Sequence, residues 1–321
     1  MPRDAPLRCV ILDDYQGVAT VYADWSRLPE VSLSVVREHL ATEDEVVARL
    51  QGATIVVVMR ERTPLTAALL ARLPDLRLVV TTGMRNASID LEACRRRGIT
   101  VCGTGSHKAP PAELTWALVL GLARAIVPEA TAFRAGGPWQ TTVGVDLAGS
   151  TLGLLGLGSI GSRVAAVARA FEMDVAAWSP HLTRERAEQA GARLVTRDEL
   201  FAGSDIVSVH LVLSEATRGI VGPAQLAAMR RTAFLVNTSR AGLVDTAALL
   251  ESLRAGHIAG AGLDVFDEEP APLDDELRSL PNVLATPHLG YVTEGNYRTY
   301  FTEAVEDIVA WLAGRPVRVI G

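Results

Sequence analysis

The chain has 321 residues, of which 49% are hydrophobic and 21% are charged, and its formal net charge at pH 7 is -6. This composition is normal for a globular protein, and the length is enough for one large or two ordinary domains. The acidic balance gives no reason to expect a nucleic-acid or acidic-membrane partner, and no apolar run reaches membrane-spanning length.

The N-terminus and the cysteines indicate the compartment. Residues 1–4 lead into a strand-like segment within ten residues, so we expect no secretory signal. Cys9, Cys94 and Cys102 lack the spacing of a metal site or a redox motif. We therefore expect no metal and a reducing, cytoplasmic location.

The first hundred residues predict alternating strands and helices. Strands are expected at 8–12, 31–36, 54–59, 77–80 and 99–101, and helices at 42–50, 65–73 and 89–97. Thr42 is the expected cap of the first of these helices, with acidic residues in its first turn. This alternation predicts a parallel sheet with helices on both faces.

The next segment predicts a linker and a long helix. Residues 103–111 are rich in Gly, Ser and Pro, and one helix is expected from 112 to 134, ending before Gly136. A final helix at 293–313 carries apolar residues on one face and should pack back on the first domain. We expect a substrate domain of residues 1–110 and 288–321, interrupted by a dinucleotide-binding domain of residues 111–287.

The segment 151–179 contains the strongest motif. An apolar strand ends before Gly156, Gly158 and Gly161, which have the G-x-G-x-x-G spacing, and a helix and a second strand follow. In a βαβ unit these glycines permit a tight turn, close approach of the backbone to a pyrophosphate, and close packing of the helix on the sheet. A glycine-rich turn without a ligand is the alternative, but the strand-turn-helix context favours a dinucleotide.

The second strand of this unit ends at Ser179, where an acid usually binds the ribose 2′-hydroxyl of NAD. Ser179 does not repel a 2′-phosphate, and Arg184 and Arg186 follow closely. The sequence therefore leaves both NAD and NADP open as cofactors.

Further strands are expected at 193–195, 205–210, 233–237, 260–265 and 283–285. Polar residues follow three of them: Arg240, Asp264 with Glu269 beyond it, and His288. Ligands of open parallel sheets bind beyond the carboxyl ends of strands, so these side chains can converge beside a nicotinamide.

These residue types suit hydride transfer to a keto acid. Arg240 can hold a carboxylate through two parallel hydrogen bonds, and His288 can give a proton to a developing alkoxide. Glu269 can orient the His288 ring. Each residue alone could equally be structural; their shared location downstream of one nucleotide loop favours catalysis.

The sequence resembles the D-isomer-specific 2-hydroxyacid dehydrogenases, the family of D-lactate, D-glycerate and phosphoglycerate dehydrogenases. The resemblance rests on 155–161, 236–245, 263–270 and 286–290, and it covers nearly the whole chain. It implies an α/β fold of two doubly wound parallel-sheet domains, a flavodoxin-like substrate domain and an inserted Rossmann domain. It also implies a homodimer with the 112–134 helix at the interface.

The resemblance also implies residue roles. Arg240 would bind the substrate's carboxylate and carbonyl oxygen, His288 would be the acid–base residue with Glu269 as its partner, and Asp264 would contact the nicotinamide amide. Formate dehydrogenases of this type carry Gln where Glu269 stands, which argues against formate. The residues assigned to the cofactor are Gly156, Gly158, Ser159, Ile160, Gly161, Ser179, His210, Thr217, Thr238, Asp264 and Gly290.

In the family, a loop of the first domain binds the substrate carboxylate through backbone N–H groups. Here that loop contains Gly83, Met84 and Arg85, and Arg60 ends the preceding strand. Arg85 is unusual at this place, and Tyr291, in place of a small residue, would narrow the pocket. Arg60 is equally compatible with a surface ion pair. We expect the active site to lie between the two domains.

The expected activity is an NAD(P)-dependent reduction of a small 2-keto acid to a D-2-hydroxy acid. The alternative is a dinucleotide-sensing interaction protein, similar to corepressors of the same family, with little turnover.

Overall fold

The structure is a computed structural model that describes residues 6–321. Residues 1–4, where no secretory signal is expected, lie outside the described residues. The described chain forms two compact units. Unit 1 consists of the residues up to His107 together with Thr293–Gly321, and unit 2 is Lys108–Val292.

Both boundaries differ from the expected ones. The sequence predicts them after residues 110 and 287, whereas unit 2 begins at Lys108 and ends at Val292. The physical reason at the second boundary is that the Asp264 carboxylate accepts hydrogen bonds from the N–H groups of Leu289 and Gly290. The loop that carries His288 therefore belongs to unit 2.

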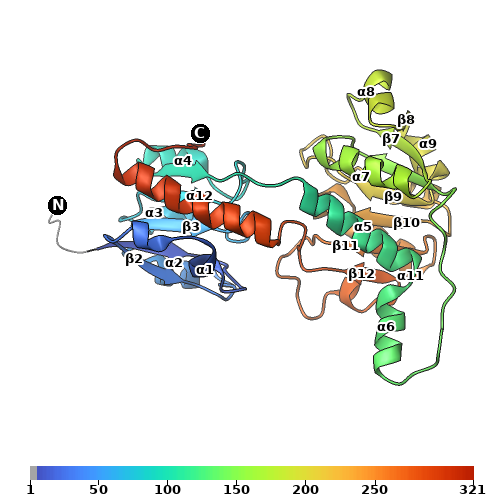
Figure 1. Ribbon diagram of the computed structural model, residues 1–321, viewed down its shortest axis with the longest axis horizontal. Helices are drawn as coiled ribbons and strands as arrows, with labels where there is room; N and C mark the ends of the chain where they lie inside the picture. The colour runs from blue at the N-terminus through green and yellow to red at the C-terminus, as the bar shows by residue number, and fades with distance from the viewer. Residues whose placement is uncertain (1–5) are drawn as a thin grey trace. The chain divides into compact units, whose positions relative to one another are not determined.

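Unit 1 contains a five-stranded sheet in the order β2-β1-β3-β4-β5, and every neighbouring pair is parallel (Figure 1). The strands are β1 (Leu7–Ile11), β2 (Val31–Val35), β3 (Ile55–Val58), β4 (Leu78–Thr81) and β5 (Thr100–Gly103). This is the flavodoxin-like strand order, in agreement with the expected fold.

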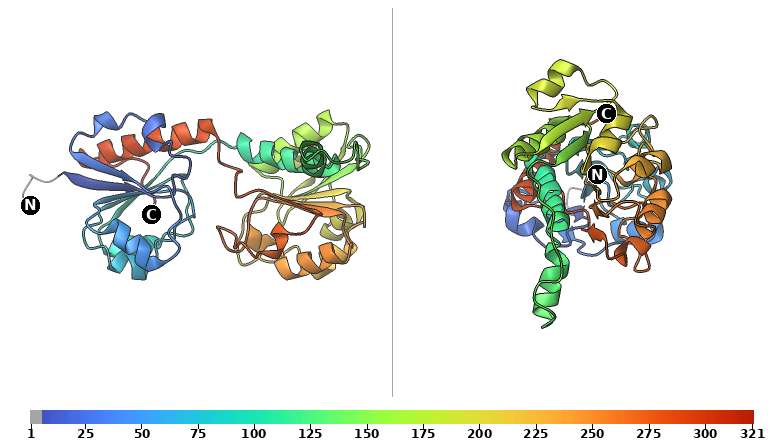
Figure 2. Two further views of the ribbon diagram at one scale, coloured as in Figure 1. Left: turned by 90° about the horizontal axis from the view of Figure 1, so that it is seen from below. Right: turned by 90° about the vertical axis from the view of Figure 1, so that its right-hand side faces the viewer.

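Helices cover both faces of this sheet (Figure 2). One face carries α1 (Ala19–Tyr22) and α12 (Glu294–Leu312), and the other carries α2 (Glu43–Leu50), α3 (Ala67–Ala71) and α4 (Leu91–Arg96). A short 3-10 helix, η1 (Trp25–Arg27), follows α1. Strands β3 and β4 are buried throughout, as their apolar runs predict. Helix α12 buries Phe301, Val305 and Ile308.

The start of α2 follows directly from its sequence. The Thr42 hydroxyl accepts the N–H of Glu45, and the Glu45 side chain accepts the N–H of Thr42. This reciprocal capping satisfies N–H groups that a helix start would otherwise leave without an acceptor.

Unit 2 contains a seven-stranded parallel sheet in the order β12-β11-β10-β9-β6-β7-β8. The strands are β6 (Thr151–Leu155), β7 (Asp174–Trp178), β8 (Arg193–Leu194), β9 (Ile206–Val209), β10 (Phe234–Asn237), β11 (Gly260–Leu263) and β12 (Val283–Ala285). The order reverses between β6 and β9, as in a Rossmann sheet, so the expected Rossmann fold is confirmed.

The helices of unit 2 form two layers (Figure 2). Helices α5 (Ala109–Ala123) and α7 (Ser159–Ala170) pack together on one face, and α9 (Arg197–Gly203), α10 (Pro223–Ala228) and α11 (Thr246–Arg254) cover the other. Helix α8 (Arg184–Gln189) joins β7 to β8, and two 3-10 helices, η2 (Ala241–Leu243) and η3 (Glu276–Arg278), lie in later loops.

The prediction of a single long helix at 112–134 is wrong. The structure has α5 and a separate α6 (Ile126–Arg134), bent by 66° at a break where Ala125 has φ +49°. Pro128 explains the break, because its ring would clash with the carbonyl of Arg124 in a continuous helix. Figure 1 shows α6 projecting from the rest of its unit. Within residues 6–321 no single helix is long and apolar enough to cross a membrane, although α5 and α6 would qualify together.

Candidate active site

The glycine turn lies between β6 and α7, at the point where the strand order reverses. Gly156 has φ +108°, and a Cβ there would lie 2.7 Å from the backbone of His210. A Cβ on Gly161 would lie 2.2 Å from the carbonyl oxygen of Gly156. Both positions therefore require glycine for the turn itself and for close packing of the helix on it.

Gly158 differs from the other two glycines because a Cβ there would meet no atom within 4 Å. It is the N-cap residue of α7 and supplies no side-chain cap. The N–H groups of Ser159, Ile160 and Gly161, in the first turn of α7, lack intrahelical acceptors. This open, positively polarised helix start fits the pyrophosphate of a dinucleotide.

Ser179 directly follows β7, the strand next to β6 in the sheet. Its carbonyl accepts the N–H of Leu182, which forms a tight turn before α8. Arg184 and Arg186 lie in the first turn of α8, and both are exposed. The end of β7 therefore carries no carboxylate and has two arginines on the adjoining helix.

His210 follows β9, and its N–H donates to the Leu155 carbonyl at 2.8 Å. Its Nε2 lies 2.9 Å from the Ser208 hydroxyl oxygen, and burial lowers the pKa of His210 to about 4. The ring is therefore neutral near pH 7. The His210 backbone lies against the glycine turn, where a Cβ on Gly156 would meet it at 2.7 Å.

Two threonines assigned to the cofactor bind other protein groups. The Thr217 hydroxyl donates to the Val212 carbonyl at 2.7 Å and accepts the N–H of Ser214 at 2.8 Å. The Thr238 hydroxyl oxygen, just past β10, lies 2.8 Å from that of Thr115 on α5. Thr217 stabilises its own loop, and Thr238 ties the end of β10 to α5.

Asp264, at the end of β11, is fully buried and holds the loop after β12. Its Oδ1 accepts the Thr286 hydroxyl and the Leu289 N–H, both at 2.7 Å, and its Oδ2 accepts the Gly290 N–H at 2.8 Å. Burial raises the pKa of Asp264, and these three bonds oppose that effect. A Cβ on Gly290 would lie 3.0 Å from Oδ2 of Asp264, so the hydrogen bonds that Asp264 makes to this loop favour glycine at position 290.

The clamped loop presents His288, which adopts a left-handed backbone with φ +53°. Its Nδ1 lies 2.5 Å from Oε2 of Glu269. The His288 and Tyr291 rings pack edge to face, with 5.3 Å between their centroids. Oε1 of Glu269 accepts the Phe266 N–H at 2.9 Å. The imidazole is thus oriented on two sides and remains partly exposed.

Burial alone would raise the pKa of Glu269. The hydrogen bond and charge attraction to His288, the Phe266 N–H and the charge of Arg240 outweigh it, so the pKa of Glu269 lies below its ordinary value. Glu269 is therefore a carboxylate at neutral pH, and the Nδ1 side of His288 faces a negative charge.

Arg240 lies between β10 and η2, and its backbone is fixed by its neighbours. The Asn237 side-chain amide donates to the Arg240 carbonyl at 2.9 Å, and an Arg240 Nη1 donates to the Ser239 carbonyl at 2.7 Å. Arg240, Glu269 and His288 all belong to unit 2, and the charge of Arg240 acts on Glu269. The guanidinium, carboxylate and imidazole expected from the strand ends therefore occur in one unit.

In unit 1, one N–H group of the loop after β4 already has a hydrogen-bond acceptor within the protein. The Gly83 N–H donates to the Thr104 hydroxyl at 2.9 Å. By contrast, the N–H groups of Met84 and Arg85 make no hydrogen bond with any residue from 6 to 321. Of the three residues Gly83, Met84 and Arg85, only the last two therefore have an N–H group available to a ligand.

Arg60 folds over the same loop. It has φ +53°, its N–H donates to the Thr82 hydroxyl at 2.9 Å, and its guanidinium donates to the Thr82 carbonyl at 3.4 Å. A Cβ on Gly83 would lie 2.2 Å from Arg60 Nη1, so glycine permits this contact. Arg85 is exposed. Arg60 therefore lies against the loop rather than on a distant surface.

Sequence analysis missed two residues of this region. Thr104, the acceptor for Gly83, follows β5 directly, so the strand-end rule applied to unit 1 would have found it. Tyr300 on α12 is buried, and its hydroxyl hydrogen-bonds to Ser106 and to Arg60. No local signal distinguishes Tyr300 from its apolar neighbours on the helix.

Comparisons with known proteins agree with this fold. A family model described as the D-isomer specific 2-hydroxyacid dehydrogenase, NAD binding domain, matches residues 116–290. The chain is similar in structure to a phosphoglycerate oxidoreductase from Vibrio cholerae, with a TM-score of 0.91, 38% identity, and coverage of 96% of this chain and 99% of that one.

Two curated relatives are similar in sequence. A glyoxylate reductase from Aeropyrum pernix is 40% identical over 77% of this chain and 76% of its own length. A D-3-phosphoglycerate dehydrogenase from Archaeoglobus fulgidus is 36% identical over 90% of this chain, which spans only about half of that relative, 54%. With the family model matching more than half of the chain and both relatives above 30% identity, the chain belongs to the D-isomer specific 2-hydroxyacid dehydrogenase family.

Proposed function

We propose that the protein is an NAD(P)-dependent oxidoreductase that interconverts a small 2-keto acid and the corresponding D-2-hydroxy acid. The observation that carries the proposal is the 2.5 Å contact between His288 Nδ1 and Glu269 in the unit that also holds Arg240 and the glycine turn. A nicotinamide cofactor, when bound, supplies or accepts the hydride. The family model describes an NAD-binding domain, which supports a nicotinamide cofactor.

The chain's own residues bind the substrate and move the proton. Arg240 holds the carboxylate and polarises the carbonyl oxygen through its planar fork of donors. His288 has its Nδ1 against Glu269, so its Nε2 is the atom that donates a proton to the oxygen as negative charge develops there. The Glu269 carboxylate holds the Nδ1 side of the ring, which keeps Nε2 directed away from it for that donation. Asp264 contributes by holding the loop that carries His288.

For the cofactor we propose that NADPH is accepted at least as well as NADH. Ser179 offers a neutral hydroxyl at the end of β7, where a carboxylate would repel a 2′-phosphate. Arg184 and Arg186 on the first turn of α8 supply positive charge close by.

For the substrate we propose a small polar or anionic 2-keto acid. Arg60 lies against Gly83, and Arg85 is exposed beside the two N–H donors of the loop. An apolar substituent placed next to such guanidinium groups would desolvate them without compensation, whereas a polar or anionic one can hydrogen-bond to them.

The test is a kinetic panel with NADH and NADPH in parallel. We expect kcat/KM for glyoxylate, hydroxypyruvate and oxaloacetate to exceed that for phenylpyruvate and 2-ketoisocaproate, and Arg85→Ala to reduce this difference. A preference for the hydrophobic acids that Arg85→Ala leaves unchanged would contradict the proposed substrate class. Tight cofactor binding without turnover of any keto acid would instead support the dinucleotide-sensing alternative.

We also propose that the protein forms a homodimer through the α5–α6 region. Helix α6 buries none of its residues, and large apolar side chains are exposed on it and just after it, including Phe133, Trp139 and Val143. Such a patch is unusual for a monomer. Light scattering should give the mass of two chains, and Phe133→Ser with Trp139→Ser should reduce it to one.

A reducing compartment such as the cytoplasm is proposed from the cysteines. Cys9, Cys94 and Cys102 are free and buried, and burial raises the pKa of each thiol. Thiols in this state are poor nucleophiles and have no disulfide to maintain. Titration of three free thiols in the unfolded protein, purified from its native cells without a reductant, would support this proposal.

A further inference from the structure

The C-terminal segment lies along the edge of the sheet in unit 1. Gly103 donates to the Arg318 carbonyl at 2.9 Å, and Ile320 donates to the Val101 carbonyl at 2.8 Å, so residues 318–320 pair with β5. A Cβ on Gly103 would lie 2.6 Å from the Ile320 side chain and 2.7 Å from the Gly83 carbonyl. The C-terminal segment thus packs directly behind the loop after β4.

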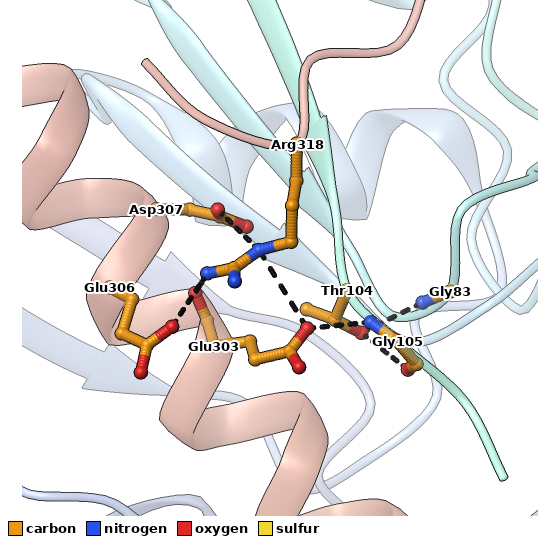
Figure 3. Close-up of polar contacts among 7 residues, drawn as sticks. All are labelled: Gly83, Thr104, Gly105, Glu303, Glu306, Asp307 and Arg318. Atoms are coloured by element: carbon orange, nitrogen blue, oxygen red, sulfur yellow. Dashed lines mark hydrogen bonds and ion pairs between the residues drawn. The ribbon is translucent and has the colours of Figure 1, made fainter. Parts of the chain in front are cut away.

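A polar network leads from the same segment to that loop (Figure 3). Arg318 has φ +50° and lies among three acids of α12. Its Nε donates to the fully buried Asp307 at 2.9 Å, and its Nη2 donates to Glu306 and to the Glu303 carbonyl, both at 2.9 Å. The Glu303 carboxylate lies 3.7 Å from the Arg318 Nε.

Glu303 connects this network to the segment after β5. Its Oε2 accepts the N–H of Gly105 at 2.6 Å, and the next residue back, Thr104, takes the N–H of Gly83. The Thr104 N–H in turn donates to the Thr81 carbonyl at 3.1 Å. A carboxylate is a stronger acceptor for an N–H group than a neutral oxygen, and the contacts with Arg318 keep Glu303 in place, so Gly105 and Thr104 are fixed from α12.

We propose that Glu303, held by Arg318, is a positioning residue for the loop of Gly83, Met84 and Arg85. By fixing Gly105 it places the Thr104 hydroxyl, which binds the Gly83 N–H and leaves the N–H groups of Met84 and Arg85 for the substrate. The inference rests on the proposed function, because the loop matters for turnover only if it binds the keto acid. Among residues 6–321, the hydrogen bonds and ion pairs of Glu303 and Arg318 do not include the loop itself.

Two neighbouring acids on α12 allow a matched comparison. Glu303→Ala removes the acceptor of Gly105, whereas Glu306→Ala removes another carboxylate that binds Arg318 but makes no bond to Gly105. We expect Glu303→Ala to raise KM for the preferred keto acid about tenfold, the usual effect of losing one hydrogen bond to a charged group. Glu306→Ala should leave KM within twofold, and NADPH affinity should be unchanged in both. Glu303→Gln keeps an acceptor and should recover most of the loss.

A second measurement does not depend on turnover. Amide hydrogen exchange of the peptide covering residues 82–88 should become faster in Glu303→Ala and remain as in the wild type in Glu306→Ala. Thr104→Val removes the acceptor of Gly83 with little change of shape and should give the same faster exchange, while Thr104→Ser should not. If Glu303→Ala does not fold, the comparison of Thr104→Val with Thr104→Ser takes its place in the exchange measurement.

Equal exchange and equal KM in the Glu303→Ala and Glu306→Ala variants would overturn the inference. Faster exchange with unchanged KM would also overturn it, since the loop would then move without consequence for the substrate. A wild type that turns over no keto acid would contradict the proposed function instead, and the exchange comparison would still decide whether Glu303 holds the loop.

Discussion

The Nδ1 atom of His288 lies 2.5 Å from Oε2 of Glu269, and the other oxygen of that carboxylate accepts the Phe266 N–H. The first prediction follows from this pair. His288→Ala should reduce kcat/KM by about 100- to 10,000-fold, because a positioned acid–base group is lost. Cofactor affinity, measured by fluorescence titration, should be nearly unchanged. Near-wild-type activity across the pH range would rule out the role of His288.

Glu269→Gln tests the same pair of residues with a smaller chemical change than His288→Ala. The amide keeps an oxygen for Nδ1–H but removes the negative charge, so the hydrogen bond that orients the ring is weaker in the variant. The loss of kcat/KM for keto-acid reduction should therefore be smaller than in His288→Ala. A kcat/KM equal to that of the wild type would show that the carboxylate charge is not used.

The second prediction concerns Arg240. Arg240→Lys should lower kcat/KM for the keto acid at least tenfold, because an ammonium cannot reproduce two parallel hydrogen bonds to a carboxylate. Steady-state kinetics with saturating cofactor would measure this. The exposed Arg254, which pairs with Glu276 in the same unit, offers a control: Arg254→Lys should have no effect. Equal activity of both variants would exclude the carboxylate clamp.

The third prediction concerns the cofactor. Ser179→Asp places a carboxylate at the end of β7 and should shift the NADPH-to-NADH ratio of kcat/KM towards NADH by at least tenfold, since the charge repels a 2′-phosphate. The ratio corrects for any general loss of activity in the variant. A wild type that already prefers NADH strongly would show that another residue decides the preference.

The fourth prediction concerns acid stability. Burial lowers the pKa of His210 to about 4 from an ordinary value of 6.5, so the folded protein holds this ring neutral while the unfolded chain protonates it. The stability that this provides is present above pH 6.5 and is lost as the pH falls towards 4. His210→Gln should therefore flatten the fall of the unfolding midpoint between pH 6.5 and 4.

The exposed His257 in the same unit provides the control for that measurement. His257→Gln should leave the pH dependence of the unfolding midpoint as in the wild type. An identical slope in all three proteins would show that His210 is protonated without cost in the folded state.

Local sequence patterns were sufficient for the two sheets and for much of the candidate site. Apolar runs form buried strands. Polar residues that follow parallel strands lie at the same edge of the sheet, whatever the conformation of the loops between the strands. Arg240, Asp264 and His288 could be selected in this way, and so could the glycine turn of Gly156 and Gly161. The break at Ala125 was also available from Pro128, because proline excludes a continuous helix by local sterics.

Other features depend on contacts between residues far apart in the chain, and only the tertiary structure decided them. Asp264 clamps the N–H groups of Leu289 and Gly290, which keeps the His288 loop in unit 2. Thr104 takes the Gly83 N–H, so the loop's free donors are different from those that its sequence suggests. Glu303 reaches Gly105 across 198 positions. The periodicity of apolar residues and the spacing of motifs depend only on residues that are close in the sequence. A buried hydrogen-bonding group needs a partner, and that partner can come from any part of the chain that the fold places beside it.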